Sequence, residues 1–221
     1  MSVLVKICGL SAPDTLDAAL DAGADMVGFV FFAPSPRNVS LHTARDLGTQ
    51  VKNRAEKVAL TVDADDATLT NIIDVLHPDL LQLHGKESPA RVTAIRQRFG
   101  LPVMKVLAIE TKADLGAIPL YSRIADRLLF DALAPREATR PGGLGKPFDW
   151  HLLDSLDLSI PFMLSGGLDA GNVAEAIRIT RAPAVDVSSG VESAPGVKDA
   201  EKIRAFIRAA RASLGRRMPV G

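Results

Sequence analysis

Short apolar segments alternate with amphipathic segments along almost the whole chain. The apolar segments are nearly continuous in apolar residues, which is typical of strands that are covered on both faces, as in a parallel sheet. We predict strands at Val3–Ile7, Met26–Phe31, Lys57–Val62, Leu80–Leu83, Val103–Leu107, Arg127–Phe130, Pro161–Leu164 and Ala184–Val187. The intervening segments repeat apolar residues at helical spacing, and they include Asp14–Ala22, Ala67–Leu76, Pro89–Phe99, Ala170–Thr180 and Lys198–Ala212.

Strands that are each followed by a helix or a helix-like connection predict an α/β fold, a (β/α)8 TIM barrel in a single domain. We expect residues 1–214 to form the barrel and residues 215–221 to form a tail. A doubly wound open sheet is the alternative, but its glycine-rich fingerprint is missing after the first strand, where the chain reads Cys8-Gly9-Leu10-Ser11. In the sixth unit, residues 132–148 are rich in proline and glycine and predict a long loop, which in a compact domain is often functional.

Composition and charge narrow the function classes. Lys plus Arg and Asp plus Glu each count 26, so the net charge is zero and the chain has no basic excess of the kind that nucleic-acid binders show. Its apolar runs are far shorter than the roughly twenty residues of a membrane helix, and no signal segment opens the sequence, so we expect a cytoplasmic protein with no membrane partner. A single cysteine excludes an internal disulfide, and no metal-ligand spacing is found, so no metal is predicted.

Polar side chains gather at the carboxyl ends of the predicted strands, which is where (β/α)8 barrels carry their chemistry. These residues are Cys8, Arg37, Asp63, Gln82, His84, Lys105, Asp131, Ser165, Asp186 and Ser188. We expect them to form a polar ring around the mouth of an otherwise apolar barrel.

The loops after the seventh and eighth strands predict a phosphate site. Ser165-Gly166-Gly167 and Ser188-Ser189-Gly190 both stand close to a predicted helix start, and glycine lets the backbone approach an anion closely. This position is the customary phosphate site of the fold. One such loop could equally be a tight turn, but two in adjacent units favour phosphate binding by Gly166, Gly167, Ser189 and Gly190.

Cys8 and Asp131 are the candidates for acid–base chemistry. A lone cysteine is commonly a small buried apolar residue, but Cys8 ends a strand, and Lys6 points to the same face, where its charge would favour a thiolate. Asp131 follows Leu128, Leu129 and Phe130, and apolar surroundings favour a protonated carboxyl, as a general acid requires. A turn-capping role is the alternative for Asp131. Together the two would present a base and an acid to one small substrate.

Three further residues have competing interpretations. Arg37 lies in a stiff segment beside Pro34 and Pro36, which would hold the guanidinium out for a bidentate contact with a carboxylate, although a solvated surface arginine is the commoner case. His84 is expected to be a hydrogen-bonded wall residue. Lys105 could form a Schiff base in an aldolase-type barrel, but nothing around it in the sequence favours that role.

In its motifs the chain resembles the phosphoribosylanthranilate isomerase family of tryptophan biosynthesis. The matching segments are Lys6-Ile7-Cys8-Gly9-Leu10, Gly28-Phe29-Val30-Phe31, Ser35-Pro36-Arg37, Gln82-Leu83-His84-Gly85, Phe130-Asp131, Gly142-Gly143 with Gly145, Phe148-Asp149-Trp150, Ser165-Gly166-Gly167-Leu168 and Asp186-Val187-Ser188-Ser189-Gly190-Val191-Glu192. Each motif is weak alone, but their order and spacing span nearly the full chain. Other phosphate-binding barrels share the glycine loops but lack the opening Lys-Ile-Cys-Gly.

The resemblance implies an Amadori rearrangement of N-(5-phosphoribosyl)anthranilate to 1-(2-carboxyphenylamino)-1-deoxyribulose 5-phosphate. Asp131 would protonate the furanose ring oxygen, and Cys8 would remove the C2 proton of the sugar. Arg37 would bind the anthranilate carboxylate. No cofactor is implied, because the nitrogen of the substrate serves as the electron sink.

The resemblance also implies binding and orienting roles. Gly143 of the sixth loop would join Gly166, Gly167, Ser189 and Gly190 at the phosphate, while His84 and Asp186 would orient the site. The expected partner is a small sugar phosphate, and the chain could be a monomer or a homodimer.

The chain departs from the family pattern in three places: Leu144 replaces a hydroxyl residue, Asn38 stands where tyrosine is common, and Asp63-Ala64-Asp65 after the third strand is more acidic than expected. Two rival functions stay open at this point. A related sugar-phosphate barrel, such as an indole-glycerol-phosphate synthase or an aldolase, would need a catalytic lysine. A non-catalytic sensor would bind the phosphate ligand without turnover.

Overall fold

Eight parallel strands form a closed barrel in the computed structural model, which describes residues 2–133, 142, 147–154, 156 and 158–213. In barrel order the strands are β1 (Leu4–Cys8), β2 (Met26–Phe31), β3 (Glu56–Thr61), β4 (Leu80–Leu83), β5 (Val103–Ile109), β6 (Arg127–Ala132), β7 (Phe162–Leu164) and β8 (Ala184–Val187). Strand β1 pairs with both β2 and β8, which closes the ring. The predicted fold class is therefore confirmed, and each predicted strand agrees with the observed one to within two residues at either end.

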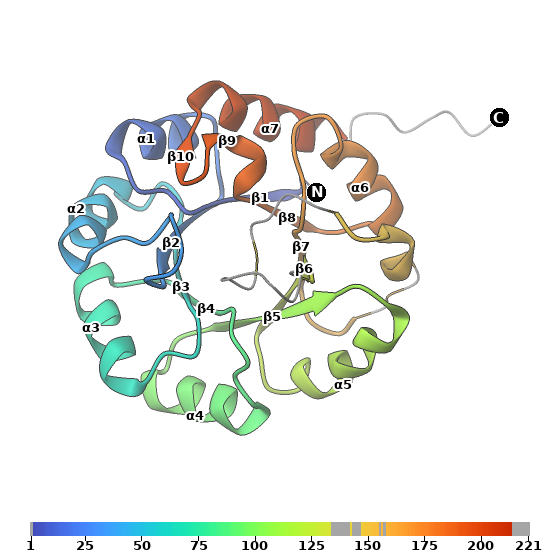
Figure 1. Ribbon diagram of the computed structural model, residues 1–221, viewed down its shortest axis with the longest axis horizontal. Coiled ribbons are helices and arrows are strands. Elements are labelled where there is room, and N and C mark those ends of the chain that lie inside the picture. The colour runs from blue at the N-terminus through green and yellow to red at the C-terminus, as the bar shows by residue number, and fades with distance from the viewer. Residues whose placement is uncertain (1, 134–141, 143–146, 155, 157, 214–221) are drawn as a thin grey trace.

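Helices surround the barrel on its outer side (Figure 1). They are α1 (Pro13–Asp21), α2 (Leu41–Val51), α3 (Asp66–Leu76), α4 (Pro89–Phe99), α5 (Ile118–Tyr121), α6 (Val173–Thr180) and α7 (Ala200–Ala212), with short 3₁₀ helices η1 (Lys112–Ala117), η2 (Trp150–Leu153) and η3 (Ser189–Val191). Serine or aspartate side chains cap α2, α3, α4 and α7, and Gly100 ends α4 in the left-handed conformation. Among the described residues no helix is long and apolar enough to cross a membrane.

Successive residues of each strand face opposite sides of the barrel wall. The outward residues pack with the helices in the main apolar core, as Val5 and Ile7 of β1 do. The inward residues fill the barrel, and its amino-terminal layers are apolar: Met26, Val58, Leu80, Met104, Val106, Leu129, Met163 and Ala184. This alternation decides which polar residues can reach the catalytic end.

Two features differ from the sequence-based expectations or were absent from them, and two further predictions are not tested by the structure. A two-stranded antiparallel hairpin, β9 (Glu192–Ala194) with β10 (Val197–Lys198), follows β8 and was not predicted. Helix α6 begins at Val173 rather than Ala170, because the Asp169 side chain accepts the backbone N–H groups of Gly171 and Asn172 and forms a turn there. The predicted tail at 215–221 and most of the predicted long loop at 132–148 lie outside the described residues.

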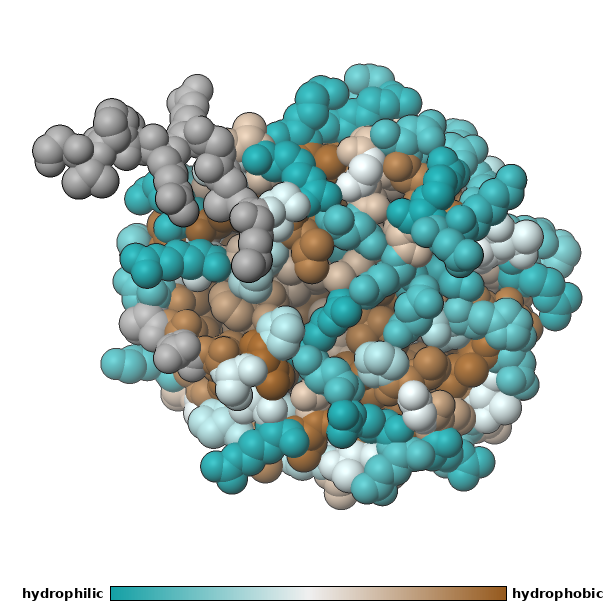
Figure 2. Space-filling view, turned by 180° about the vertical axis from the view of Figure 1, so that it is seen from behind, coloured by the Kyte–Doolittle hydropathy of each residue, from teal (hydrophilic) through white to brown (hydrophobic). Residues whose placement is uncertain are grey.

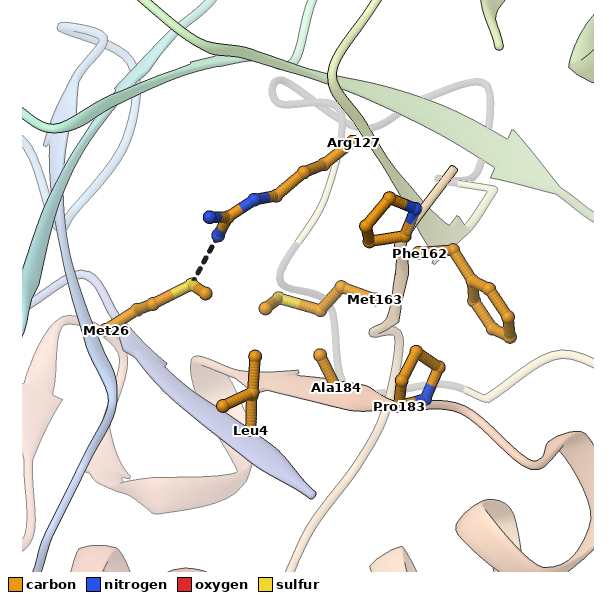
Figure 3. A pocket seen from close by; sticks show the side chains of 8 residues that line it. Leu4, Met26, Arg127, Phe162, Met163, Pro183 and Ala184 are labelled. Atoms are coloured by element: carbon orange, nitrogen blue, oxygen red, sulfur yellow. Dashed lines mark hydrogen bonds between the residues drawn. The ribbon is translucent and has the colours of Figure 1, made fainter. Parts of the chain in front are cut away.

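An apolar pocket of about 140 Å³ lies at the amino-terminal end of the barrel (Figure 3). Met26 and Met163 point into it, and the Arg127 guanidinium reaches across to the Met26 sulfur at 3.6 Å and pairs with Glu56. Leu4, also in its lining, is 41% exposed. The face shown in Figure 2 also exposes apolar residues among the hydrophilic ones. The pocket is at the opposite end from the predicted catalytic residues, so it is not the active site.

Candidate active site

A buried polar group lies inside the barrel where β1, β7 and β8 meet. Lys6 is completely buried, and its Nζ donates to Asp186 Oδ1 at 2.8 Å. The Ser165 hydroxyl donates to the other carboxylate oxygen of Asp186 at 3.0 Å. Cys8, the last residue of β1, is 3% exposed and on the same inward face as Lys6. Asp186 therefore orients Lys6, and it does so as half of a buried ion pair.

The surroundings of Cys8 correct one expectation about this residue. Burial raises the pKa of the Cys8 thiol, and the charge of Lys6 lowers it, with burial the larger effect, so the pKa lies above that of an ordinary thiol. Asp186 contributes to the increase, because its carboxylate opposes a second negative charge nearby. Burial also lowers the pKa of Lys6, but Asp186 and Cys8 more than offset this and keep the amine charged. Lys6 thus supports the thiolate without making it the dominant form near neutral pH.

The second polar group joins β4 to β6. His84 follows β4, and its Nε2 lies 3.2 Å from Asp131 Oδ2. The other ring nitrogen, Nδ1, lies 3.2 Å from the Nε2 atom of Gln82, which precedes it by two residues and so faces the same side of the strand. Asp131 is inward on β6 and 4% exposed, and its Oδ1 accepts the N–H of Ala132. The carboxyl group therefore has one oxygen bound to backbone and one directed at His84.

Glycines on two loops pack directly against Asp131. A methyl group added at Gly142 would lie 2.5 Å from Asp131 Oδ2 and 2.8 Å from His84 Nε2. A methyl group at Gly166 would lie 3.1 Å from Asp131 Oδ1 and 2.5 Å from the Ala132 nitrogen, and Gly166 has a φ of +85°. Both positions need glycine, because any side chain would overlap the carboxyl group or its backbone neighbour.

The two predicted phosphate loops lie side by side. Gly190 packs on the backbone carbonyl of Leu168, where a Cβ would overlap it, so the loop after β8 touches the loop after β7. Gly167 also has positive φ, at +66°, and Ser189 and Gly190 begin η3. The geometry thus brings Gly166, Gly167, Ser189 and Gly190 into one region, whereas Gly143, predicted from the sixth loop, lies outside the described residues, as does Leu144.

Arg37 is held differently from what its prolines suggest. The guanidinium is not held out into solvent; Arg37 is 4% exposed and makes a bidentate ion pair with Glu192, with Nε–Oε1 at 2.6 Å and NH2–Oε2 at 2.8 Å. Lys198 donates to Glu192 Oε1 at 2.8 Å and to the Ser188 hydroxyl. Burial would raise the pKa of Glu192, but Arg37 and Lys198 lower it overall. The unpredicted hairpin therefore anchors Arg37.

Asn38, one of the departures from the family pattern, has a structural role, since its Oδ1 accepts the N–H of Phe32.

Lys105 was expected in the polar ring at the mouth of the barrel, but it faces the outer side of the barrel wall, because strand residues alternate between the two sides. Its neighbours Met104 and Val106 face the interior, and its Nζ donates to the carbonyls of Leu83 and Gly85 and to Glu87 Oε2. Glu87 in turn accepts the N–H groups of Asp63 and Gly85. The amine is thus engaged in fixing the loops after β3 and β4, which argues against a Schiff base at this position.

The sequence missed residues whose role depends on distant partners. Glu192 and Lys198 gave no signal of contact with Arg37, since 155 residues separate Arg37 from Glu192. Gln82 was expected in the polar ring without a role, and its contact with His84 could have been found, because the two residues share the inward face. No group of three or more metal-binding side chains occurs in the part of the chain that the structure describes.

Residues 5–209 match the family model of N-(5′-phosphoribosyl)anthranilate (PRA) isomerase. The chain belongs to this family. PRA isomerase catalyses an aldose–ketose isomerisation in tryptophan biosynthesis, and this is the activity of the chain.

Relatives and solved structures agree with this assignment. The N-(5′-phosphoribosyl)anthranilate isomerase of Bradyrhizobium diazoefficiens is 71% identical over 213 residues, covering 96% of each chain. A PRA isomerase crystallised with reduced 1-(o-carboxyphenylamino)-1-deoxyribulose 5-phosphate is 31% identical, with a TM-score of 0.81 over 95% of this chain and 99% of that one. A monomeric form of the dimeric PRA isomerase of Thermotoga maritima is 32% identical, with a TM-score of 0.80 over the same shares.

Proposed function

We propose that the chain converts N-(5-phosphoribosyl)anthranilate to 1-(2-carboxyphenylamino)-1-deoxyribulose 5-phosphate with Asp131 as general acid and Cys8 as general base. The observation that carries this proposal is the position of both side chains, which are inward and buried at the carboxyl ends of β6 and β1. Asp131 protonates the ring oxygen, the C1–O bond breaks, and the anthranilate nitrogen forms a Schiff base with C1. The Cys8 thiolate then takes the C2 proton, and the resulting enolamine tautomerises to the ketone.

The buried pair of Lys6 and Asp186 supports the base. Proton removal requires the thiolate, and the Lys6 charge opposes the burial that raises the pKa of Cys8. Asp186 keeps Lys6 in position, which is an orienting role rather than a proton transfer. His84, beside Asp131, orients the acid.

Binding roles follow from the chemistry of the two ends of the substrate. Arg37 binds the anthranilate carboxylate from the position in which Glu192 holds it. The loop residues Gly166, Gly167, Ser189 and Gly190 bind the phosphate with backbone N–H groups, and Gly143 is a further candidate from outside the described residues.

The partner in this proposal is a small sugar phosphate, and the reaction as written needs no cofactor or metal. A cytoplasmic location belongs to the same proposal. Monomer and homodimer are both open for this chain; the Thermotoga maritima relative is dimeric.

The loss of substrate fluorescence tests the proposal. Purified chain mixed with freshly made N-(5-phosphoribosyl)anthranilate, with a metal chelator present, should rapidly abolish the anthranilate emission. Cys8→Ser and Asp131→Asn should each lower kcat about 10²–10⁴-fold, the usual contribution of one acid or base. Asp46→Asn, an exposed carboxylate on α2, is the matched control and should leave turnover unchanged.

Two outcomes would contradict the assignment. Turnover retained by either variant would remove the role given to that residue. Tight binding of substrate without loss of emission would instead indicate a sensor of sugar phosphates.

A further inference from the structure

Gln82 is a completely buried amide inside the barrel, and only one of its two ends has a hydrogen-bonding partner among the described residues. Its Nε2 lies 3.2 Å from His84 Nδ1, whereas its Oε1 has no partner in the described part of the chain. Burying an amide has a free-energy cost unless hydrogen bonds compensate for it. A residue that only fills space at this position would be apolar, as its inward neighbour Leu80 is.

The contact between the amide and the ring selects one protonation state of His84. An amide nitrogen carries two N–H groups and has no acceptor, so the Nδ1 atom that it faces must carry a lone pair. The proton of the neutral ring is then on Nε2, the atom that lies 3.2 Å from Asp131 Oδ2 but makes no hydrogen bond in the described part of the chain. A doubly protonated ring would point an N–H at the amide N–H groups, so this contact also opposes the imidazolium form.

The reverse orientation of the amide fits the surroundings less well. With Oε1 toward the ring, Nδ1 would carry the proton and Nε2 would present a lone pair to the Asp131 oxygen. Once Asp131 has given its proton to the substrate, a lone pair facing its ionised carboxylate is repulsive, whereas an N–H facing it is attractive. At that stage of the reaction the ionised Asp131 therefore favours the same tautomer that the amide nitrogen selects.

We propose that Gln82 is a positioning residue that keeps His84 neutral with its proton on Nε2. This inference rests on the proposed role of Asp131 as the acid. A neutral ring can donate a hydrogen bond to the carboxylate that remains after Asp131 has protonated the substrate. A charged ring would form an ion pair with Asp131 and hold the carboxyl ionised before the reaction, when it must carry its proton.

The charged groups around His84 are consistent with this control by the amide. Asp131 of β6 is the ionisable side chain that lies against the ring in the described part of the chain, and Gly142 packs beside it without a side chain. Lys105 of the adjacent strand β5 is directed away from the interior and is bound to Glu87. Lys6 is bound to Asp186 at the junction of β1 and β8.

Kinetics of two Gln82 variants test the proposal. Gln82→Met keeps the length of the side chain but removes the donor, and kcat should fall about tenfold, the effect of one lost hydrogen bond, with KM changed less than about twofold. Gln82→Glu should lose more, because a carboxylate would accept a proton from Nδ1 and favour the charged ring. In the kcat profile of both variants, the loss should grow as pH falls through the range in which imidazole takes up a proton.

Thr61→Val is the matched control. The Thr61 hydroxyl is buried without a partner in the described part of the chain, on the neighbouring strand, but it alternates with the inward residue Leu60 and so faces outward. The Thr61→Val variant should leave kcat and its pH profile unchanged. A kcat for Gln82→Met equal to that of the control would overturn the proposal.

A spectroscopic measurement tests the tautomer independently of turnover. The ¹⁵N shifts of the His84 ring, assigned by their loss in His84→Gln, should show a neutral ring protonated at Nε2 near neutral pH in the wild type. In Gln82→Glu they should show the charged ring or the Nδ1–H tautomer. A wild-type ring that is charged or protonated at Nδ1 would overturn the role of Gln82 alone. Turnover retained by Asp131→Asn would instead overturn the acid assignment, so the two failures can be told apart.

Discussion

Cys8 is subject to two opposed electrostatic effects of different origin. Burial raises the pKa of the thiol, and the charge of Lys6 lowers it. The fraction of Cys8 that is thiolate therefore depends on how firmly Lys6 is held beside it. Asp186 holds the Lys6 amine at 2.8 Å, but the negative charge of Asp186 itself raises the pKa of Cys8.

Removing Lys6 should raise the pKa of Cys8 further. In Lys6→Met the thiolate loses its nearest cation, so its ultraviolet absorbance should appear at higher pH than in the wild type. The chain has one cysteine, so Cys8→Ser supplies the baseline. Lys112→Met, an exposed lysine in η1, is the control and should titrate as the wild type does.

The double variant Lys6→Met/Asp186→Asn separates the two charges. It removes the carboxylate that raises the pKa of Cys8 as well as the amine that lowers it, so its titration should lie below that of Lys6→Met. Thiolate formation at lower pH in Lys6→Met than in the wild type would contradict this account.

At the residue scale, strand periodicity made part of the site predictable. Lys6 and Cys8 are two residues apart on a strand, which correctly predicts a shared face. The net direction of the Cys8 shift was not predictable, because it depends on how far burial exceeds the effect of Lys6. The partner of Arg37 was not predictable either, because Glu192 reaches it only through the hairpin after β8.

At the element scale, the ion pair between Lys105 of β5 and Glu87 allows a test of whether Lys105 has a structural role. Lys105 and Glu87 are 3% and 2% exposed at their side chains, and Glu87 also binds two backbone N–H groups. Breaking a buried pair on one side leaves an uncompensated charge, which typically destabilises by about 3–5 kcal/mol.

Lys105→Met should therefore lower Tm by on the order of 10 °C while reducing kcat far less than Cys8→Ser does. Lys105→Met/Glu87→Gln should recover part of the lost Tm, because no buried charge is left unpaired. Calorimetry and the fluorescence assay measure the two quantities. Borohydride trapping of substrate on Lys105 would contradict this structural role and revive the aldolase-like alternative.

The elements themselves were largely predictable, because long apolar strands and capped helices are specified locally. Strands β2, β4 and β8 match the sequence-based ranges at both ends, as does α4 with Ser88 at its start and Gly100 at its end. Helix α2 was not among the predicted helices, since its sequence, Leu41–Val51, is mostly polar. The hairpin strands β9 and β10 have three and two residues, too few for a periodic pattern.

At the scale of the whole molecule, buried carboxylates make stability depend on pH. Burial would raise the pKa of Glu87 and of Glu192, but their cationic partners lower both overall, relative to 4.5. A lowered folded-state pKa gives stabilisation that is complete above the unfolded value and is lost as pH falls through the folded value.

The free energy of unfolding should therefore decrease as pH falls below about 4.5. Urea unfolding at a series of pH values measures it. The difference in the free energy of unfolding between the wild type and Glu87→Gln should shrink over the same range. Protonation of Glu87 in the wild type removes the charge that the variant lacks. A difference that stays constant down to the lowest pH at which the chain folds would exclude Glu87 as a source of the dependence.

Strand β4 shows how this architecture separates two kinds of mutational constraint. Gln82 and His84 face the reacting end, whereas Leu81 and Leu83, in between, pack against the helices. Inward substitutions would reduce turnover in a folded protein, and outward substitutions would reduce the amount of folded protein. Evolution can therefore adjust the heat tolerance of such a barrel through its outward residues while the inward ones keep the chemistry, since neighbours in sequence are under separate selection.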